Sequence, residues 1–223
     1  MTSEICLPGK IEDKGCVNTM REKLEQVAAA MAARGFDAIV TDTAAQAASF
    51  IRKSIPAGET VAIGGSSTIK DMDLHTQLRE DGHKVLWHWE AAPADRPAVL
   101  HEAMNAPHYL CSANAVTEDG LIVQIDGTGN RVAALCYGPG DVYMIIGRNK
   151  IVEGGYQQAV RRIKQVACPA NARRLNLDTP CAKDGKCNAS ACTQSMCHLT
   201  LAIEGASGGK KTHIVLVNED LGY

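Results

Sequence analysis

Residues 60–68 read TVAIGGSST, a short apolar run that ends in glycines and hydroxyl side chains. Thr60–Ile63 has the composition of a buried strand. Four small residues follow it: Gly64, Gly65, Ser66 and Ser67. Paired glycines let a backbone approach an anion, and serine hydroxyls can donate to carboxylate or phosphate oxygens. A tight turn with a serine helix cap would use the same residues. The stretch therefore predicts a strand followed by either a ligand loop or a capped turn.

Similar apolar runs recur along the chain and alternate with segments of helical periodicity. The strands that we expect are Ala38–Thr41, Thr60–Ile63, Lys84–Trp89, His108–Ala113, Leu121–Asp126, Asp141–Gly147 and His213–Val217. The helices that we expect are Val17–Arg34, Thr43–Lys53, Leu74–Arg79, Ala98–Asn105, Val132–Tyr137 and Gly155–Val166. Strands that are apolar throughout imply a mostly parallel sheet buried on both faces. The sequence therefore predicts an α/β fold with helices on both faces of that sheet.

The domain organisation follows from composition. Residues 1–16 lack periodicity, and we expect a flexible arm there, followed by a single domain over residues 17–223. Within this domain, residues 167–209 are rich in Cys, Asn, Ser and Gly, so we expect an excursion laid over the sheet.

Composition also excludes several classes of protein. The net charge is −2 and only 4% of residues are aromatic, which argues against binding to nucleic acid. No apolar run approaches the roughly 20 residues needed to span a bilayer, and the start lacks a signal-peptide pattern. We therefore expect a cytoplasmic protein without nucleic-acid or membrane partners.

Polar residues follow three further expected strands, and parallel sheets bind ligands at the carboxyl ends of their strands. Asn114, Thr117 and Glu118 follow one strand, although a polar turn would also explain Glu118. The loop DGTGNR presents Asp126, Asn130 and Arg131, and it lacks the third glycine of a dinucleotide fingerprint. Asn149 and Lys150 follow the strand that ends at Gly147, where a lysine suits an anionic group. These residues predict one anion-binding site at a single edge of the sheet.

Four of the nine cysteines fall within the excursion: Cys181, Cys187, Cys192 and Cys197. Their spacing lacks the close C-x2-C pairs of zinc ribbons and ferredoxins. Three interpretations remain open, namely an iron–sulfur cluster or zinc, free thiols, and disulfides. Lys183 and Lys186 would lower the pKa of neighbouring thiols. His198, beside Cys197, is the histidine of greatest interest.

At these residues the chain resembles a known family. The stretches VAIGGSSTIKDMDL, NAVTEDGLIVQIDGTGNRVAALCYGP, NKIV, PANARRLNLDTPCAKDGKC and VLVNEDLGY are similar to motifs of the LUD (lactate utilisation) domain family, YkgG/LutC-like branch. The likeness covers nearly all of residues 17–223. It implies a Rossmann-like fold of the NagB/RpiA/CoA-transferase-like class, with its site at the carboxyl ends of the strands. It also implies a link to oxidation of L-lactate to pyruvate with iron–sulfur partner subunits.

Carried over by motif, the resemblance implies catalytic roles for Glu118 and Lys150. The implied substrate-binding residues are Gly64, Gly65, Ser66, Ser67, Asn114, Thr117, Asp126, Asn130, Arg131 and Asn149. The candidate metal ligands, chosen from the clustering of cysteines in the excursion, are Cys181, Cys187, Cys192 and Cys197. The chain departs from the family at Ser190, where a third cysteine is common, and at Arg148, where an apolar residue is usual.

The leading hypothesis is therefore a component of lactate oxidation that binds a small 2-hydroxy or 2-oxo carboxylate, alone or as a homo-oligomer. One alternative is a CoA- or nucleotide-handling enzyme of the same fold class, with Glu118 as nucleophile. Another is a non-catalytic redox module whose cysteines hold an iron–sulfur cluster or zinc.

Overall fold

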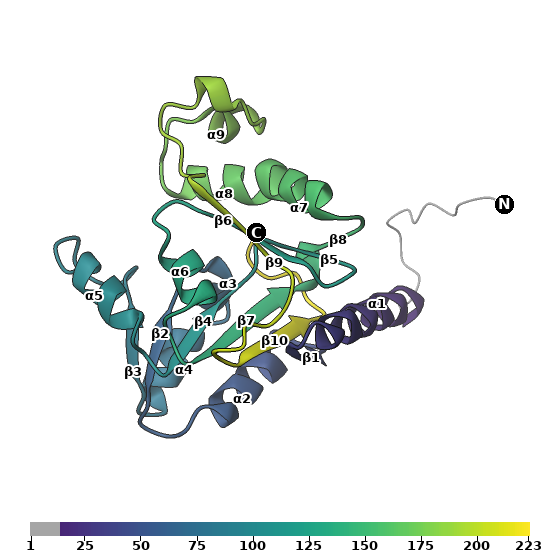
Figure 1. Cartoon of the computed structure of the whole chain (residues 1–223), viewed down its shortest axis with the longest axis vertical. Coiled ribbons are helices and arrows are strands. Elements are labelled where there is room, and N and C mark those ends of the chain that lie inside the picture. The colour runs from purple at the N-terminus through teal and green to yellow at the C-terminus, as the bar shows by residue number, and fades with distance from the viewer. Residues whose placement is uncertain (1–13) are drawn as a thin grey trace.

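The computed structural model describes residues 14–223, with side chains from Thr19 onward. Its elements form a six-stranded sheet, a smaller four-stranded sheet and the helices that cover them (Figure 1). The arm expected for residues 1–16 lies outside the described residues apart from its last three, which begin helix α1 (Lys14–Ala33). None of the described helices combines the length and the apolar character needed to cross a bilayer.

The larger sheet is parallel throughout, which confirms the predicted architecture. Its strands, in spatial order, are β1 (Asp37–Thr41), β10 (Thr212–Val217), β7 (Asp141–Gly147), β4 (His108–Cys111), β2 (Thr60–Ile63) and β3 (Lys84–Trp87). Ile63 pairs with Leu110 on one side and with Trp87 on the other. These three strands therefore end at the same level, and the loops after them meet at one edge.

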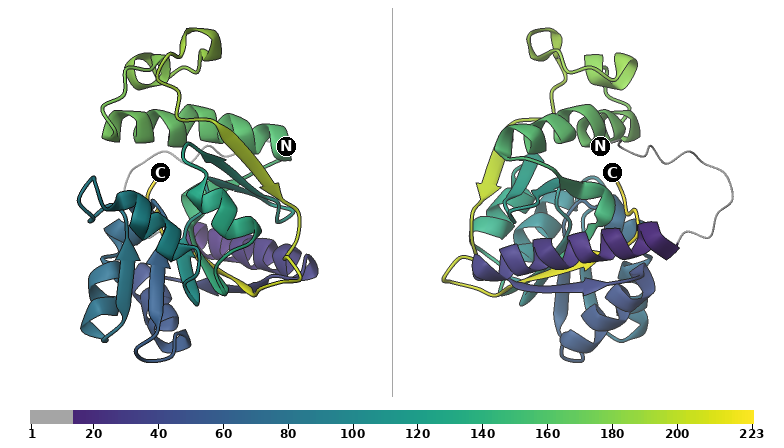
Figure 2. Two further views of the ribbon diagram at one scale, coloured as in Figure 1. Left: turned by 60° about the vertical axis from the view of Figure 1, so that its left-hand side comes forward. Right: turned by 90° about the vertical axis from the view of Figure 1, so that its right-hand side faces the viewer.

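Helices cover both faces of this sheet (Figure 2). One face packs against α1, α5 (Arg96–Ala103) and α6 (Asn130–Cys136), and the other packs against α2 (Ala44–Ser54), α3 (Ser67–Asp71) and α4 (Leu74–Glu80). Successive strand residues point to opposite faces, so Ala62 packs in the first layer while Val61 and Ile63 pack in the second. Apolar residues on both sides of each strand explain why the strands show no polar alternation.

The smaller sheet departs from the sequence prediction. Its strand order is β8 (Ile151–Val152), β5 (Ala115–Thr117), β6 (Ile122–Asp126) and β9 (Leu199–Ile203), and the β5–β6 and β6–β9 pairs are antiparallel. The run expected as a main-sheet strand at Leu121–Asp126 is thus β6 of this second sheet. The fully buried β6 carries no alternation that would have distinguished the two sheets. Strand β9 comes from the excursion at 167–209.

A long helical run covers the second sheet. It begins as α7 (Tyr156–Arg162), continues through a π-helical turn (Ile163–Ala167), and ends as α8 (Cys168–Arg174). Its apolar side chains pack on β5 and β6. Pro169 has no N–H to continue an α-helical ladder, and a wide turn just before it relieves that conflict. The helix expected to stop at Val166 therefore runs on, and only α9 (Pro180–Asp184) and the loops around it project from the body.

Candidate functional site

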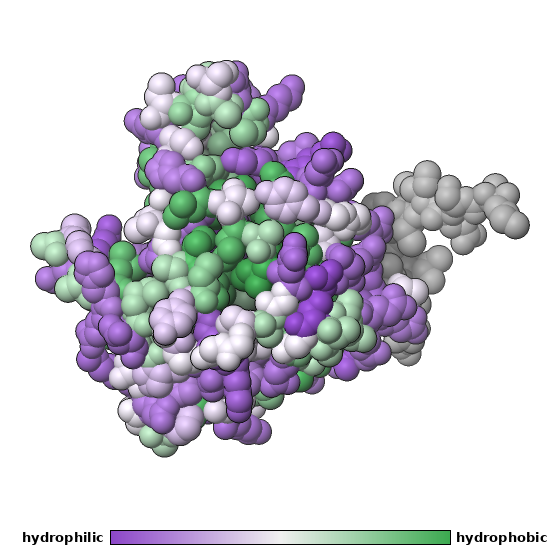
Figure 3. All heavy atoms as spheres, viewed as in Figure 1, coloured by the Kyte–Doolittle hydropathy of each residue, from purple (hydrophilic) through white to green (hydrophobic). Residues whose placement is uncertain are grey.

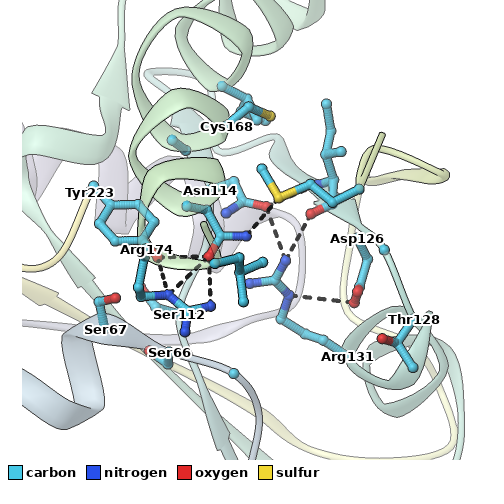
Figure 4. Close-up of a pocket in the computed structure, with 18 of the residues that line it drawn as sticks. Ser66, Ser67, Ser112, Asn114, Asp126, Thr128, Arg131, Cys168, Arg174 and Tyr223 are labelled. Atoms are coloured by element: carbon cyan, nitrogen blue, oxygen red, sulfur yellow. Dashed lines mark hydrogen bonds and ion pairs between the residues drawn. The ribbon is translucent and has the colours of Figure 1, made fainter. Parts of the chain in front are cut away.

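A cavity of about 250 Å³ lies where the parallel strands end (Figure 4). The loops after β2, β3 and β4 form its base, and β6, α6 and α8 face them. Figure 3 shows apolar residues gathered at the centre of the face in view, between the α7–α8 run and the larger sheet. The cavity therefore sits at the junction of the two sheets, at the sheet edge that the sequence predicted.

The glycines after β2 are required by close packing. A Cβ on Gly64 would lie 2.8 Å from the hydroxyl of Tyr109, and a Cβ on Gly65 would lie 3.1 Å from Nε1 of Trp89. Ser66 then caps α3, because its Oγ accepts a hydrogen bond from the Ile69 amide at 3.3 Å. The capped turn is thus present, and Gly65 to Thr68 also line the cavity, whereas ligand binding by this stretch stays a prediction.

Lys150 is the most deeply buried charged side chain at the cavity, with 3% of its surface exposed. It lies in a short 3-10 turn after β7, and its Nζ donates to Thr68 Oγ1 and to Ser112 Oγ, both at 2.8 Å. Burial lowers the pKa of Lys150 to about 7, and the positive charges of Arg162 and Arg131 lower it further in the same direction. Gly222 covers this lysine, since a Cβ there would lie 2.7 Å from Thr68 Oγ1.

Arg131 projects into the cavity from the start of α6 (Figure 4). Its guanidinium donates to Asn114 Oδ1 at 3.2 Å and to the Ile125 carbonyl at 2.9 Å. Its Nε is buried without a hydrogen-bond partner and lies 3.7 Å from a carboxylate oxygen of Asp126. The same carboxylate accepts the Gly129 and Val132 amides, so Asp126 holds the loop and only partly neutralises Arg131.

A second guanidinium lies behind the cavity. Arg162, on α7, donates to the backbone carbonyl of Asn114 at 2.6 Å and to that of Asn149 at 2.9 Å. Neither acceptor carries a formal charge, and burial lowers the pKa of Arg162. Arg131 and Lys150 thus line the cavity and Arg162 lies behind it, whereas Asp126 supplies the one side-chain carboxylate among the described lining residues. The cavity is therefore electrostatically suited to an anion.

The opposite wall carries an aromatic and amide cluster. The Arg174 guanidinium lies 4.2 Å from the ring centroid of Trp89 and donates to Asn171 Oδ1 and Tyr223 Oη. Tyr223 Oη in turn donates to Asn171 Oδ1 at 2.8 Å. On the same side, Nδ1 of His88 is buried without a partner, and burial lowers the pKa of this imidazole. These planar side chains close one side of the cavity.

Two cysteines line the cavity beside this cluster. The sulfur of Cys168, on α8, lies 3.4 Å from the sulfur of Cys197. The hydrogen bond from Cys168, together with Lys164, lowers the pKa of Cys197 to about 6, while the pKa of Cys168 is raised.

The four predicted metal ligands do not assemble in this arrangement. Cys181 lies at the start of α9 with its sulfur 3.4 Å from Thr179 Oγ1, and Cys187 is exposed. Among the side chains that the structure describes, from Thr19 onward, no group of three or more His, Cys, Asp or Glu is placed to hold a metal ion. The described cysteines therefore do not fit a cluster or a zinc ion as they stand, and such binding stays a prediction.

Eight predicted residues line the cavity together: Gly65, Ser66, Ser67, Asn114, Asp126, Asn130, Arg131 and Lys150. Gly64 and Asn149 support it from behind, and Asn149 holds the C-terminal segment through hydrogen bonds to Leu221 and Gly222. Thr117 and Glu118 lie elsewhere. Thr117 organises the β5–β6 turn through Leu121, and the Glu118 carboxylate pairs with Lys23 at 2.6 Å.

Several lining residues escaped the sequence prediction: Trp89, Ser112, Cys168, Asn171, Arg174, Met196 and Tyr223. Ser112 directly follows β4, so the rule that ligands meet strand ends would have found it. Trp89 follows β3, within the run that was expected to be strand as far as Trp89. The others belong to α8, to the excursion or to the C-terminal segment, and they reach the cavity through long-range packing.

Comparison with known proteins agrees with this architecture. The family model described as LUD domain matches residues 24–217. A crystal structure of a DUF162 family protein from Deinococcus radiodurans is similar over 89% of this chain and 97% of that one, with 17% identity and a TM-score of 0.54. Crystal structures of eIF2B beta and of the tetrameric eIF2B-beta2-delta2 complex from Chaetomium thermophilum match about half of the chain, 50% and 53%, and cover 43% and 47% of theirs. Their identities are 18% and 20%, with TM-scores of 0.36 and 0.35. A search of curated proteins found no match.

Proposed function

This chain belongs to the LUD domain family, and on that premise we propose that its cavity binds a small carboxylate of the 2-hydroxy or 2-oxo acid class. The observation that carries the proposal is the convergence of Lys150 and Arg131 on one small cavity. Lys150 is 3% exposed and Arg131 has a side-chain exposure of 14%. Two buried cations at one cavity are costly unless a ligand or a neighbour supplies negative charge.

The hydrogen-bonding groups suit both ends of such an acid. A guanidinium that lines the cavity can bind a carboxylate oxygen, and Arg131 is such a group. The hydroxyls of Ser66 and Ser112 and the amide of Asn114 can donate to, or accept from, the 2-hydroxy or 2-oxo oxygen. The cavity lies slightly below the usual size of cofactor pockets, about 300 Å³ or more, which favours a compact metabolite.

Within this proposal the chain acts as a component of lactate oxidation to pyruvate. That reaction removes two electrons and two protons from the substrate, so it requires a redox partner. The family link to iron–sulfur partner subunits supplies a candidate of the right class. In this account the chain's own residues bind and orient the carboxylate, and Lys150, with its pKa near 7, can hold or release a proton at the substrate oxygen.

Isothermal titration with L-lactate, pyruvate and the neutral analogue lactamide tests the proposal. We expect one site per chain for the two acids and at least tenfold weaker binding of lactamide, because the amide lacks the charge that the cavity attracts. Equal binding of the acid and its amide, or no heat with either acid, would remove the proposal.

No observation in the described structure favours the CoA-transfer alternative. Its candidate nucleophile, Glu118, is paired with Lys23 and does not line the cavity. The carboxylate-binding role needs only residues that the structure has brought together.

A further inference from the structure

Cys168 and Cys197 form a close thiol pair that carboxylate binding does not use. Their sulfurs lie 3.4 Å apart, whereas the chain positions are 29 residues apart. Neither belongs to a metal group among the described residues. A disulfide requires a sulfur–sulfur distance near 2.05 Å, so the sulfurs need approach by only about 1.4 Å.

The two cysteines sit on elements that differ in their freedom to move. Cys168 is buried in the helical run, directly after the π-helical turn. Cys197 lies in an irregular segment just before β9 and is partly exposed. A backbone without helical or strand hydrogen bonds can shift by an ångström more easily than a packed helix. Cys197 is therefore the cysteine that an oxidant reaches and that moves toward its partner.

A cation lies beside the pair. Lys164 lies in the π-helical turn, one helical turn before Cys168, and its positive charge acts on the Cys197 sulfur. Two other described cysteines differ from this pair: Cys111 is fully buried, and Cys136 is exposed on α6.

We propose that Cys197 and Cys168 are a redox-active pair that reacts with peroxides and closes to a disulfide in the wall of the cavity. The Cys197 thiolate attacks one peroxide oxygen, so that an S–O bond forms, the O–O bond breaks, and the leaving oxygen takes up a proton as water. The Cys168 thiol then attacks the sulfenic sulfur, an S–S bond forms, and the S–O oxygen leaves as a second water. Two thiols are oxidised and one peroxide is reduced to two waters.

The test is disulfide mapping on the full chain. Reduced protein is treated with one equivalent of hydrogen peroxide, alkylated, digested and analysed by mass spectrometry. We expect the dominant disulfide-linked peptide to join Cys168 and Cys197. Cys136 should be alkylated, because it should still be a free thiol after oxidation. A dominant Cys187–Cys192 bridge, or full alkylation of Cys168 and Cys197, would overturn the proposal. So would thiols that resist alkylation until a chelator is added, because a metal would then occupy them.

Serine variants assign the order of events and conserve side-chain size. With Cys168→Ser, a sulfenic acid at Cys197 should persist and be trapped by dimedone. With Cys197→Ser, dimedone labelling at Cys168 should fall at least tenfold below that level. The matched control Cys136→Ser should leave the bridge unchanged. Equal labelling of both positions would contradict the assigned order, and the mapping of the unaltered chain remains decisive if a variant does not fold.

Discussion

The two walls of the cavity differ in how their polar groups are held. The inner wall, defined as Ser66, Ser112, Asn114, Arg131 and Lys150, follows strands of both sheets and is tied by direct hydrogen bonds. The outer wall, defined as Trp89, Cys168, Arg174, Cys197 and Tyr223, comes from α8, from loops and from the C-terminal segment. Arg174 there is exposed, whereas Lys150 is buried.

Because of this difference, we expect the two walls to have different roles in ligand binding. Charges in a dry environment interact strongly with a ligand, whereas exposed charges are screened by water and salt. The inner wall should therefore dominate affinity for an anion, and the outer wall should contribute closure and thiol chemistry. Substitutions confined to one wall at a time test this difference.

The largest expected effect comes from Arg131→Gln, on the inner wall. Hydrogen bonds to a charged partner contribute about 1.5–3 kcal/mol, so carboxylate affinity should fall about 10- to 100-fold in calorimetric titration. Arg161→Gln, an exposed arginine on α7 outside the cavity, is the matched control and should bind as the unaltered chain does. Equal affinities for the two variants would place the ligand elsewhere.

Lys150→Met should remove the pH dependence of binding. In the unaltered chain Lys150 has a pKa of about 7, so its ammonium attracts an anion at pH 6 and is progressively lost as the pH rises. Affinity should fall by up to about tenfold per pH unit above pH 7, because one proton is coupled to binding. Titrations from pH 6 to pH 9 should show this slope in the unaltered chain and a weak, flat profile in the variant. A slope that persists in Lys150→Met would assign the proton to another group.

Lys150 should also make the free energy of unfolding depend on pH. The pKa of Lys150 is lowered by folding from 10.5, so between about pH 7 and pH 10 the unfolded chain binds the additional proton. The free energy of unfolding should therefore gain a contribution that increases with pH in this window. Denaturant unfolding of the unaltered chain relative to Lys150→Met measures that contribution, and a difference that is constant with pH would contradict the lowered pKa.

Arg174→Gln, on the outer wall, should have a smaller effect. Arg174 is exposed, and an exposed ion pair contributes about 0.2–1 kcal/mol, so we expect affinity to fall at most about fivefold. Raising the salt concentration should reduce the difference further, because Arg174 is exposed. A loss as large as that of Arg131→Gln would show that both walls bind the charge.

The smallest effect is expected for Glu118→Gln. Its partner Lys23 is 28% exposed and Glu118 is 42% exposed, and pairs of this kind contribute at most about 1 kcal/mol to stability. Carboxylate affinity should stay within twofold of the unaltered value. A larger loss of affinity would restore Glu118 as a residue of the site.

Part of the inner wall could be predicted from the sequence. Gly65, Ser66 and Lys150 follow strands of the parallel sheet, and the rule that parallel strands end together brings them to one edge. Asp126 and Arg131 follow β6 of the second sheet, so the rule placed them at the cavity only because β6 was expected in the main sheet. Local patterns suffice here because the sheet itself supplies the long-range order.

The same rule failed for Asn114 and Glu118 when they were assigned to one site. Both were expected to follow a strand, but residues 115–117 form β5, so the two side chains lie at opposite ends of a strand. Each strand residue adds about 3.3 Å, which separates them by roughly 13 Å. The outer wall escaped prediction for a different reason, since Arg174 and Cys168 reach the cavity only through the packing of α8 on the second sheet.

The most direct test of anion binding at this cavity uses its own fluorescence. The chain has two tryptophans, Trp87 and Trp89, which stack with their ring centroids 5.3 Å apart. Trp89 lies in the cavity wall. Titrating pyruvate or L-lactate should change their emission with a single saturable curve, lactamide should compete at least tenfold more weakly, and Arg131→Gln should shift the midpoint to 10- to 100-fold higher concentration. Emission that does not respond to either acid, or a midpoint unchanged in Arg131→Gln, would contradict the assignment of this cavity as a carboxylate site.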